Sequence, residues 1–398
     1  MSCIPFAQFD ILCPMKTVLY FQSKSKINAR EKFGGVRKIA VKCDWHVQVV
    51  EGLPSRKRLG ALIEFWHPVG AIIECGGTAV TVDPAIFGTL PVVFLDHDPS
   101  SLPKNAFCVT HDSAATARMA AQELLRGEAK EFAFVPYPEH RFWSEERERS
   151  FVSALALNGY GCHTFHNQHA QSDSTRYQGA LRAFIADLPK PCALFAANDQ
   201  TAAEVLTAAA FVGARVPEEL SVVGVDNAAD ICEHTKPTLS SVKPDFHRGG
   251  YLAALLLEAR LREKSKFRGS RHRTFGPLLM VRRASTRHLA ENDTVVSAAL
   301  ELIRREACSG LSAQDVLKHF PCSRRQAEMR FRKATGHSVL DEIHAVQLEL
   351  VKHLLTDDSM PLKALSDFCG FDHPNSLRKF FKKQTGQSMT DWRASQMG

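Results

Sequence analysis

Polar side chains suited to holding a polyhydroxyl molecule follow three apolar runs in the first part of the chain. They are Trp143, Arg147, Asn198, Asp199 and Asp226. Carboxylates and amides exchange paired hydrogen bonds with neighbouring hydroxyl groups, a guanidinium adds donors, and an indole packs against the apolar face of a sugar ring. Each residue alone has a simpler explanation, because Asp or Asn after a strand is often a helix cap and a lone Trp usually belongs to a core. Their recurrence at corresponding positions favours a sugar-binding cleft.

Short apolar runs alternate with helical segments up to residue 283, and this alternation predicts βαβ units with parallel sheets. We predict strands at 17–21, 45–50, 70–74, 91–95, 107–110, 131–135, 193–197, 221–225 and 278–283, and helices at 27–41, 58–65, 114–125, 145–157, 177–186, 202–212 and 249–261. The basic stretch from Arg260 to Arg273 is interpreted as a solvated surface loop. The sequence thus predicts a two-lobed α/β fold with doubly wound parallel sheets, and ligands of such folds bind at the carboxyl ends of the strands.

From Val295 onward the pattern is entirely helical, and the segment 361–386 predicts two helices around a tight break. Gly370 can take the left-handed conformation that ends a helix, Pro374 is tolerated in a first turn, and Gly386 stops the second helix. The predicted buried stripe of that helix is Leu377, Phe380 and Phe381. A short helix, a glycine turn and a basic helix are typical of a helix-turn-helix, and the alternative is an ordinary helical hairpin with a solvated basic face.

A second such unit is predicted at 311–336, where Ser312 and Asp315 form a capping pair and Ser323 caps the following helix. A long helix at 338–355 joins the two units, which predicts an all-α domain with two recognition helices about one turn of DNA apart. The side chains expected to contact DNA are Ser323, Arg324, Arg325 and Glu328 in the first unit, and His373, Asn375, Ser376, Arg378, Lys379 and Lys382 in the second.

The composition agrees with a DNA-binding protein that works inside the cell. The 398 residues allow two or three domains, and the net charge of +7 suits a polyanionic partner without being extreme. The eleven cysteines are never paired as CxxC, which favours reduced thiols in the cytoplasm. No apolar run reaches the ~18 residues of a membrane span, and the first 15 residues are interpreted as a leader without a secretory signal, with Met15 as an alternative start.

Enzymatic and metal chemistry find little support in the sequence. His163, His166 and His169 recur every third residue, but the Gly, Asn and Gln around them favour a loop over a metal site. His111, Asp112 and Ser113 have the residue types of a catalytic triad, but their adjacency is the wrong geometry. We find no phosphate-binding loop or nucleophile elbow, and we expect no catalytic residue, no metal and no cofactor.

Two stretches resemble known families. Residues 194–241, and above all the run VPEELSVVG at 216–224, resemble the sugar-binding domain of LacI/GalR repressors. The resemblance implies that Arg147, Asn198, Asp199 and Asp226 line the effector cleft, and it adds Asp112. Residues 295–397, with LSDFCGF at 365–371 and FFKKQTG at 380–386, resemble the DNA-binding domain of the AraC/XylS family. They depart from its pattern at Met389, where Pro is usual, and at Gln347, where Arg is usual.

A LacI-like sensor followed by an AraC-type domain is the arrangement of xylose-operon activators. It implies a sensor at 16–284, a linker at 285–294 and a DNA-binding domain at 295–398. It also implies a cytoplasmic homodimer that binds double-stranded DNA, a sugar such as xylose, and RNA polymerase. The alternatives are a repressor or a regulator for another carbohydrate, a solute-binding protein of a transporter, and an enzyme with a helical accessory domain.

Overall fold

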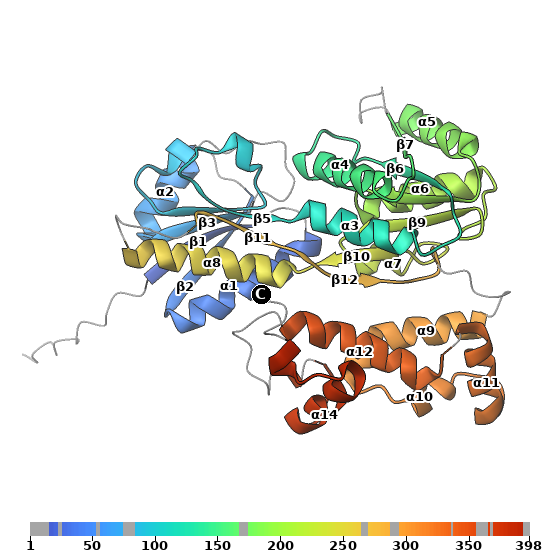
Figure 1. Cartoon of the computed structure of the whole chain (residues 1–398). Coiled ribbons are helices and arrows are strands. Elements are labelled where there is room, and N and C mark those ends of the chain that lie inside the picture. The colour runs from blue at the N-terminus through green and yellow to red at the C-terminus, as the bar shows by residue number, and fades with distance from the viewer. Residues whose placement is uncertain are drawn as a thin grey trace, which may run out of the picture. The chain divides into compact units, whose positions relative to one another are not determined.

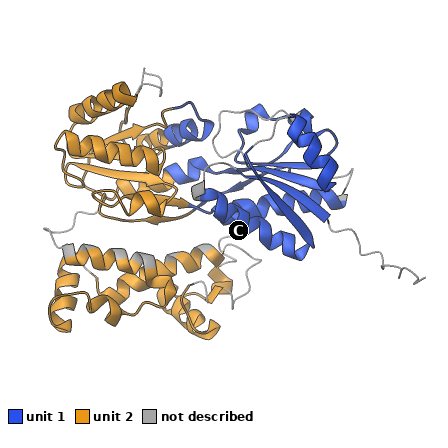
Figure 2. Ribbon diagram, turned by 180° about the vertical axis from the view of Figure 1, so that it is seen from behind, with its two compact units in different colours: residues 1–117, 139–150, 244–277 blue, residues 118–138, 151–243, 278–398 orange. Residues whose placement is uncertain are grey.

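The structure is a computed structural model. It describes residues 16–22, 26–52, 56–74, 84–166, 174–263, 270–286, 294–335, 337–355, 365–366 and 369–392. The predicted leader and most of the predicted linker lie outside these residues. The chain forms two compact units (Figure 2). Unit 1 holds residues 1–117, 139–150 and 244–277, and unit 2 holds residues 118–138, 151–243 and 278–398.

A six-stranded sheet in the order β11-β5-β4-β3-β1-β2 forms the centre of unit 1, and every neighbouring pair in it is parallel. Its strands are β1 (Lys16–Gln22), β2 (Trp45–Glu51), β3 (Gly70–Glu74), β4 (Val92–Leu95), β5 (Phe107–His111) and β11 (His272–Phe275). Its helices are α1 (Lys26–Lys42), α2 (Arg56–Trp66) and α8 (Phe246–Glu263), with short 3-10 turns at Pro84–Phe87 and Pro99–Ser101.

Both faces of the central strands of this sheet are buried, as expected of a parallel sheet covered by helices. Successive side chains of a strand point to opposite faces. Val18 and Tyr20 of β1 therefore join the core formed with α1 and α8, whereas Leu19 and Phe21 join the core formed with α2. This arrangement explains why the strands read as continuous apolar runs in the sequence.

The second sheet has the order β12-β10-β9-β8-β6-β7, and its pairs from β10 to β7 are parallel. Its strands are β6 (Glu131–Val135), β7 (His163–Thr164), β8 (Cys192–Ala196), β9 (Leu220–Val225), β10 (Ser240–Pro244) and β12 (Pro277–Val281). The helices in this part of the chain are α3 (Ser113–Leu124), α4 (Phe142–Ala156), α5 (Ser174–Asp187), α6 (Asp199–Phe211) and α7 (Ala229–Cys232). The predicted pair of doubly wound parallel sheets is confirmed (Figure 1).

The described elements of the C-terminal domain are all helices, as predicted. The domain contains α9 (Thr294–Glu306), a 3-10 turn η3 (Ala307–Ser309), α10 (Ala313–Leu317), α11 (Arg324–Thr335), α12 (Val339–Leu355) and α14 (Pro374–Thr385). Side chains of α9 to α11 and the start of α12 form one apolar core, and the end of α12 and α14 contribute to a second. Met389, one of the two departures from the AraC/XylS pattern, is buried in the second core.

Three helix starts in this domain share one capping arrangement. The hydroxyl oxygen of Ser312 accepts a hydrogen bond from the backbone N–H of Asp315, whose carboxylate in turn accepts from Ser312. The pairs Ser338–Asp341 and Ser388–Asp391 contain the same hydroxyl-to-carboxylate bond and the same bond to the Asp backbone N–H. Each pair satisfies donors that a helix N-terminus leaves free.

Contrary to our prediction, the basic stretch from Arg260 to Arg273 is not only a loop. The helix α8 continues to Glu263, and His272 begins β11, an edge strand that pairs with β5. Three of the four side chains of β11 are exposed, so no apolar run marks it in the sequence. The analysis also missed β10, because its buried Ser240 and Ser241 read as loop residues.

Hydrogen bonds of Ser285 explain how a polar strand such as β10 is tolerated in a core. The Ser285 hydroxyl accepts from the backbone N–H of Ser240 at 2.8 Å and donates to the carbonyl of Val222 at 2.6 Å. The backbone of Ser285 also bonds to Val222 and Thr238. The ordered fold of unit 2 therefore continues past residue 284, where we expected the linker to begin.

Among the helices of the described residues, none combines the length and the hydropathy needed to cross a lipid bilayer.

Glycines let α1 and α8 cross in direct backbone contact. A Cβ atom added at Gly250 would lie 1.8 Å from the carbonyl oxygen of Lys32, and one added at Gly35 would lie 2.0 Å from that of His247. Even one extra methyl group would therefore force the helices apart and disturb the core between them and the sheet.

We expect Gly250→Ala to lower the free energy of unfolding by about 1–3 kcal/mol, as overpacking usually does. The matched control is Gly60→Ala in α2, where nothing lies within 4 Å of the added atom. Because Ala is the better helix former, this control should be neutral or raise stability by up to ~1 kcal/mol. Urea denaturation of both variants measures the difference, and equal stabilities would contradict the close crossing.

Candidate functional site

In unit 1 the predicted residue Arg147 is 4% exposed and is held by a histidine. The Nη2 atom of Arg147 lies 3.2 Å from Nδ1 of His111, and Nε2 of His111 lies 2.8 Å from the hydroxyl of Thr116. A guanidinium can only donate, so Nδ1 is the acceptor and Nε2 carries the ring proton. The Thr116 hydroxyl then donates to the carbonyl oxygen of Asp112 at 3.1 Å. This chain of donors fixes the guanidinium of Arg147.

The electrostatics of unit 1 keep His111 neutral. Burial, together with the positive charges of Arg147 and Lys32, holds the pKa of His111 well below its usual value. A neutral ring is the form that accepts a hydrogen bond from Arg147. The second predicted partner, Trp143, has its ring centre 4.8 Å from the guanidinium carbon of Arg147. Trp143 and Arg147 therefore form one stacked pair at the start of α4, as their four-residue spacing suggests.

Asp112 takes part in the same arrangement as a helix cap. One of its carboxylate oxygens accepts a hydrogen bond from the backbone N–H of Ala115 at 2.7 Å, at the start of α3. Its own N–H donates to the carbonyl of Phe275 on the neighbouring strand. Asp112 remains partly exposed, and its proposed contact with a ligand stays a prediction.

The sequence analysis missed a buried group of charges in unit 1. The amine of Lys32 forms ion pairs with Glu74, at 3.1 Å, and with Asp96, and the hydroxyl of Tyr20 donates to Glu74 at 2.9 Å. Burial alone would lower the pKa of Lys32, but Asp96 and Glu74 outweigh it and raise that pKa. Lys32 thus stays charged within the fold.

Asp96 of this group lies directly after β4 and has a positive φ of 57°, which is uncommon for a residue other than glycine. Its Oδ1 atom is buried and has no hydrogen-bond partner among the described residues. The positions of Glu74 at the end of β3 and Asp96 after β4 were the signal available in the sequence. Both are carboxylates at strand ends, like the residues that we selected.

In unit 2 the predicted residues Asn198 and Asp199 begin α6. The side-chain oxygen of Asn198 accepts from the backbone and the hydroxyl of Thr201, so it serves as the helix cap that we considered as an alternative. Asp199 is 1% exposed. Its oxygens accept from the Ser241 hydroxyl at 2.6 Å, the Ala228 N–H at 2.8 Å and the Cys232 thiol at 3.2 Å. Asp199 therefore ties α6 to β10 and to the loop after β9.

That loop contains the predicted residue Asp226 and its neighbour Asn227, both with positive φ, of 113° and 51°. Such strain in residues other than glycine often marks a functional site, because the surrounding structure must hold it in place. The N–H of Asn227 donates to Ser241, while its Oδ1 atom is buried without a hydrogen-bond partner among the described residues. Asn227 is a further candidate that the sequence analysis did not name.

Ionisation of Asp199 is unfavourable. Burial first, and then the nearby charge of Asp226, raise the pKa of Asp199 to about 7. The three donors that face its oxygens oppose this effect and favour the carboxylate. The loop that carries Asp226 is thus supported by a group that changes its charge near neutral pH.

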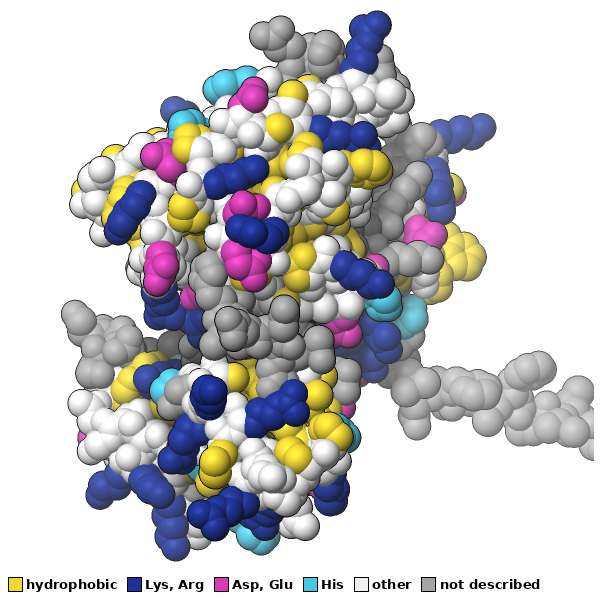
Figure 3. Space-filling model, turned by 90° about the vertical axis from the view of Figure 1, so that its right-hand side faces the viewer, with side chains coloured by type: hydrophobic (Ala, Val, Ile, Leu, Met, Phe, Trp, Pro, Cys, Tyr) yellow, Lys and Arg dark blue, Asp and Glu magenta, His cyan; other side chains and the backbone are white. Residues whose placement is uncertain are grey.

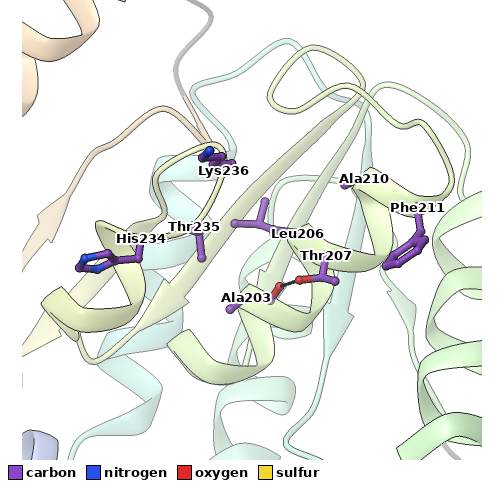
Figure 4. A pocket seen from close by; sticks show the side chains of 8 residues that line it. All are labelled: Ala203, Leu206, Thr207, Ala210, Phe211, His234, Thr235 and Lys236. Atoms are coloured by element: carbon purple, nitrogen blue, oxygen red, sulfur yellow. Dashed lines mark hydrogen bonds between the residues drawn. The ribbon is translucent and has the colours of Figure 1, made fainter.

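An open groove of about 470 Å³ lies elsewhere in unit 2, along α6 and the turn after α7 (Figure 4). Its lining includes Leu206, Ala210, Phe211, His234 and Lys236. Phe211 is 66% exposed, and the guanidinium carbon of Arg182 on α5 lies 3.7 Å from the centre of its ring. None of the predicted sugar-binding residues lines this groove.

A metal site finds no support in the part of the chain that the structure describes, which holds no cluster of three potential ligands. His163 instead pairs with Glu131 at 2.9 Å, and His169 lies outside the described residues. The eight described cysteines are free thiols.

The first predicted helix-turn-helix has its expected geometry. Ala327 and Phe331 of α11 are buried, while Ser323, Arg324 and Arg325 are exposed and Glu328 is partly exposed. The hydroxyl of Ser323 donates to the side chain of Gln326, which completes a cap at the start of α11. The positive side of this helix is therefore left to solvent.

The second unit also matches its prediction where it is described. Gly370 has φ of 76°, Pro374 opens α14 after the cap residue His373, and Gly386 ends α14 with φ of 74°. The residues of α14 predicted to be buried are Leu377, Phe380 and Phe381, and all three are. Most of the helix predicted before Gly370 lies outside the described residues.

The predicted DNA-contacting side chains of the second unit are all exposed, namely His373, Asn375, Ser376, Arg378, Lys379 and Lys382. Arg378 donates to Asn375 at 3.1 Å, so these two side chains are neighbours on one face of α14. On the face in Figure 3, Lys and Arg side chains outnumber acidic ones over the C-terminal helices. The face suits a phosphate backbone.

Comparisons with known proteins agree with this division of the chain. Residues 121–286 match the model of the periplasmic binding protein-like domain, and residues 316–395 match that of a helix-turn-helix domain. The xylose operon regulatory protein of Haemophilus influenzae is 28% identical over 72% of this chain and 74% of its own length. That of Escherichia coli K12 is 28% identical over 75% of this chain and 76% of its own.

A solved structure of a xylose-binding transcription activator matches 95% of this chain and 98% of its own, with a TM-score of 0.58 and 24% identity. A transcriptional regulator in complex with cellobiose matches 68% of this chain and 84% of its own, with a TM-score of 0.55 and 19% identity. The chain contains a periplasmic-binding-protein-like sensor domain and a C-terminal helix-turn-helix domain, as its sequence indicates.

We expect the stability of the protein to fall as pH rises from about 4 to 7 because of Asp199. The folded state keeps a proton on Asp199 up to pH about 7, whereas the unfolded chain releases it near pH ~4. The folded state is therefore favoured at low pH and loses this contribution as pH rises through 7.

The variant Asp199→Asn removes this titration, so its melting temperature should depend less steeply on pH between 5 and 8. The lowered pKa of His111 acts in the opposite direction, but it is present in both proteins and cancels in their difference. Parallel melting-temperature profiles of the two proteins would show that Asp199 does not titrate in this range.

Proposed function

We propose that this chain, a periplasmic-binding-protein-like domain joined to a helix-turn-helix domain, is a sequence-specific transcriptional regulator controlled by a monosaccharide. The observation that carries the proposal is the presence, in one chain, of a doubly wound sensor and a helix-turn-helix domain, together with similarity to xylose operon regulatory proteins over 75% of the chain. A pentose such as xylose is the first candidate effector, and genes of sugar catabolism are the candidate targets. We propose that the protein activates rather than represses its target genes, because the similar solved protein is named a transcription activator.

The proposed ligand contacts are Asp112, Trp143 and Arg147 of unit 1 and Asn198, Asp199 and Asp226 of unit 2. Their chemistry favours a neutral polyol. Carboxylates repel phosphorylated or acidic sugars, whereas the stacked Trp143 and Arg147 provide an apolar ring and fixed donors. Besides its proposed contact with the ligand, Asp199 supports the loop of Asp226, because three donors engage its oxygens.

In the proposed mechanism the sugar shifts a population of conformations. A ligand can favour one state only by binding it more tightly than the other. Sugar binding then raises the fraction of molecules that can bind DNA through both helix-turn-helix units. In this way the sugar site is coupled to the DNA-binding surface. We propose that the protein acts in the cytoplasm as a homodimer and contacts RNA polymerase. The groove around Phe211 offers an exposed apolar surface for dimer formation.

Arg147→Ala should weaken sugar binding at least ~10-fold, because it removes charge-assisted hydrogen bonds to the ligand. His111→Phe should weaken it in the same direction, since Phe keeps the ring contact with Phe275 but cannot accept from Arg147. The matched control is Arg182→Ala, which also removes a guanidinium stacked on an aromatic ring but contacts Phe211 rather than any of the predicted sugar-binding residues.

Thermal shifts of the wild-type protein against pentoses, hexoses and uronic acids identify the sugar, and titration calorimetry then compares the variants. Full sugar binding by Arg147→Ala would place the ligand elsewhere.

Arg325→Ala and Arg378→Ala should each lower affinity for specific DNA at least ~10-fold, as the loss of a base or phosphate contact does. The probe is a duplex enriched from a random library by the wild-type protein with its sugar, and fluorescence anisotropy gives the affinity. Lys318→Ala removes an exposed positive charge at the C-terminal end of α10, which is not a recognition helix, and should have a smaller effect. Unchanged affinity in both arginine variants would mean that α11 and α14 do not read DNA.

A further inference from the structure

Gln347 stands at the centre of a helix face that is otherwise apolar. Ile343, Val351 and Leu355 lie one or two turns away on the same face of α12 and are fully buried or nearly so, and Gln347 itself is only 6% exposed. Ile343 belongs to the core of the first helix-turn-helix unit, and Val351 and Leu355 belong to the core of the second. Gln347 therefore occupies the boundary between the two cores.

The side chain of Gln347 donates to one carbonyl on each side of this boundary. Its Nε2 atom lies 3.0 Å from the carbonyl oxygen of Ala307 and 3.3 Å from that of Cys369. An amide group carries two protons on this nitrogen, so both bonds can form at once. Ala307 begins η3 and packs into the core of the first helix-turn-helix unit, and Cys369 immediately precedes the glycine turn of the second.

Within the C-terminal domain, the backbones on the two sides of this boundary also touch beside Gln347. A Cβ atom added at Gly370 would lie 2.9 Å from the carbonyl carbon and oxygen of Cys308, and Gly370 has a φ of 76°. No side chain other than hydrogen fits here without displacing the backbone of the other unit. Gly370 therefore contacts Cys308 directly. Gln347 links the residues next to these two in the sequence, Ala307 and Cys369, by its two hydrogen bonds.

We propose that Gln347 is a positioning residue that fixes the separation and rotation of the two recognition helices of one chain. It thereby sets the spacing that this protein accepts between two DNA half-sites, each of which is the segment contacted by one recognition helix. The inference rests on the proposed function as a DNA-binding regulator. The buried carbonyls of Ala307 and Cys369 each need a hydrogen-bond donor. Gln347 can donate to both carbonyls only while the two helix-turn-helix units keep their mutual orientation. Recognition helices α11 and α14 belong to the two units joined in this way.

A buried polar group suits this role better than an apolar one. Apolar side chains tolerate sliding, because their contacts are not directional, whereas two hydrogen bonds from one amide define both distance and angle. The usual Arg of the AraC/XylS pattern is replaced here by a neutral amide, and its observed contacts are with two backbone carbonyls inside the domain.

The experiment measures how affinity depends on half-site spacing. The duplex selected by the full-length wild-type protein is lengthened or shortened by one or two base pairs between its half-sites. Each base pair rotates one half-site by about 35° relative to the other, given roughly 10–10.5 pairs per turn. We expect wild-type affinity to fall at least ~10-fold when two pairs are inserted, because recognition helices held at a fixed separation cannot follow both half-sites.

The variant Gln347→Met has a similar size and no donor. It should keep its affinity for duplexes with a single half-site, lose several-fold in affinity for the selected duplex, and show a difference of less than ~3-fold between the selected and the lengthened duplex. Gly370→Ala disturbs the same contact from the other side and should also broaden the accepted spacing. Gln347→Asn, whose shorter amide cannot reach both carbonyls, serves the same purpose if Gln347→Met does not fold.

The matched control is Ile343→Val, which trims the core of the first unit one turn before Gln347 and lowers the melting temperature without removing a hydrogen bond. It should retain the spacing preference of the wild-type protein. If Gln347→Met and Gly370→Ala keep that preference too, Gln347 does not set the spacing. If the wild-type protein enriches no sequence from the library, the proposed function itself fails, which is a different outcome.

Discussion

Parallel pairing of strands is the constraint on which the sensor part of this protein depends. A parallel sheet has all its carboxyl ends at one edge, so the residue after each strand meets the residues after its neighbours. In unit 1 this edge gathers Glu74, Asp96 and His111, and in unit 2 it gathers Asn198 and Asp226. The same strands have apolar side chains on both faces, so polar chemistry is confined to their ends.

Polar groups placed at such edges must be supported, and the two units solve this differently. Unit 1 neutralises buried carboxylates with an ammonium group, since Lys32 pairs with both Glu74 and Asp96. Unit 2 surrounds a single carboxylate with neutral donors, and the result is an Asp199 whose pKa lies near 7. Removal of one partner from either group would leave a buried polar or charged atom with fewer compensating contacts, which costs stability.

Periodicity in the sequence was sufficient to predict the architecture and most of its elements. The continuous apolar strands and the two glycines Gly370 and Gly386 are local features, and both glycines adopt the left-handed conformation expected of them. Gly386 ends α14, whereas most of the helix predicted before Gly370 lies outside the described residues. The strands β10 and β11 could not be predicted in this way. The serines of β10 can be buried because residues far away in the sequence satisfy their hydrogen bonds: Ser285 and Arg283 pair with Ser240, and Asp199 accepts from Ser241. The strand β11 is an edge strand with exposed side chains.

For the candidate site, the residue types were predictable, but their partners were not. Trp143 and Arg147 were found by spacing, whereas His111, which orients Arg147, can be recognised only from its position in space. Lys32 lies on α1, distant in sequence from both carboxylates that it binds. The direction of the Asn227 side chain and its unpartnered oxygen likewise depend on a backbone conformation that residue type alone does not determine.

The Ser–Asp pairs at the starts of three C-terminal helices have an evolutionary consequence. Each pair marks a helix start with two residues that are only three apart, so the boundary is encoded within a few positions and needs no information from the sensor. A domain specified in this local manner can be inherited as a unit and joined to another ligand-binding domain without redesign of its helices. Gene fusion can therefore combine such a reader with a new chemical signal in a single step.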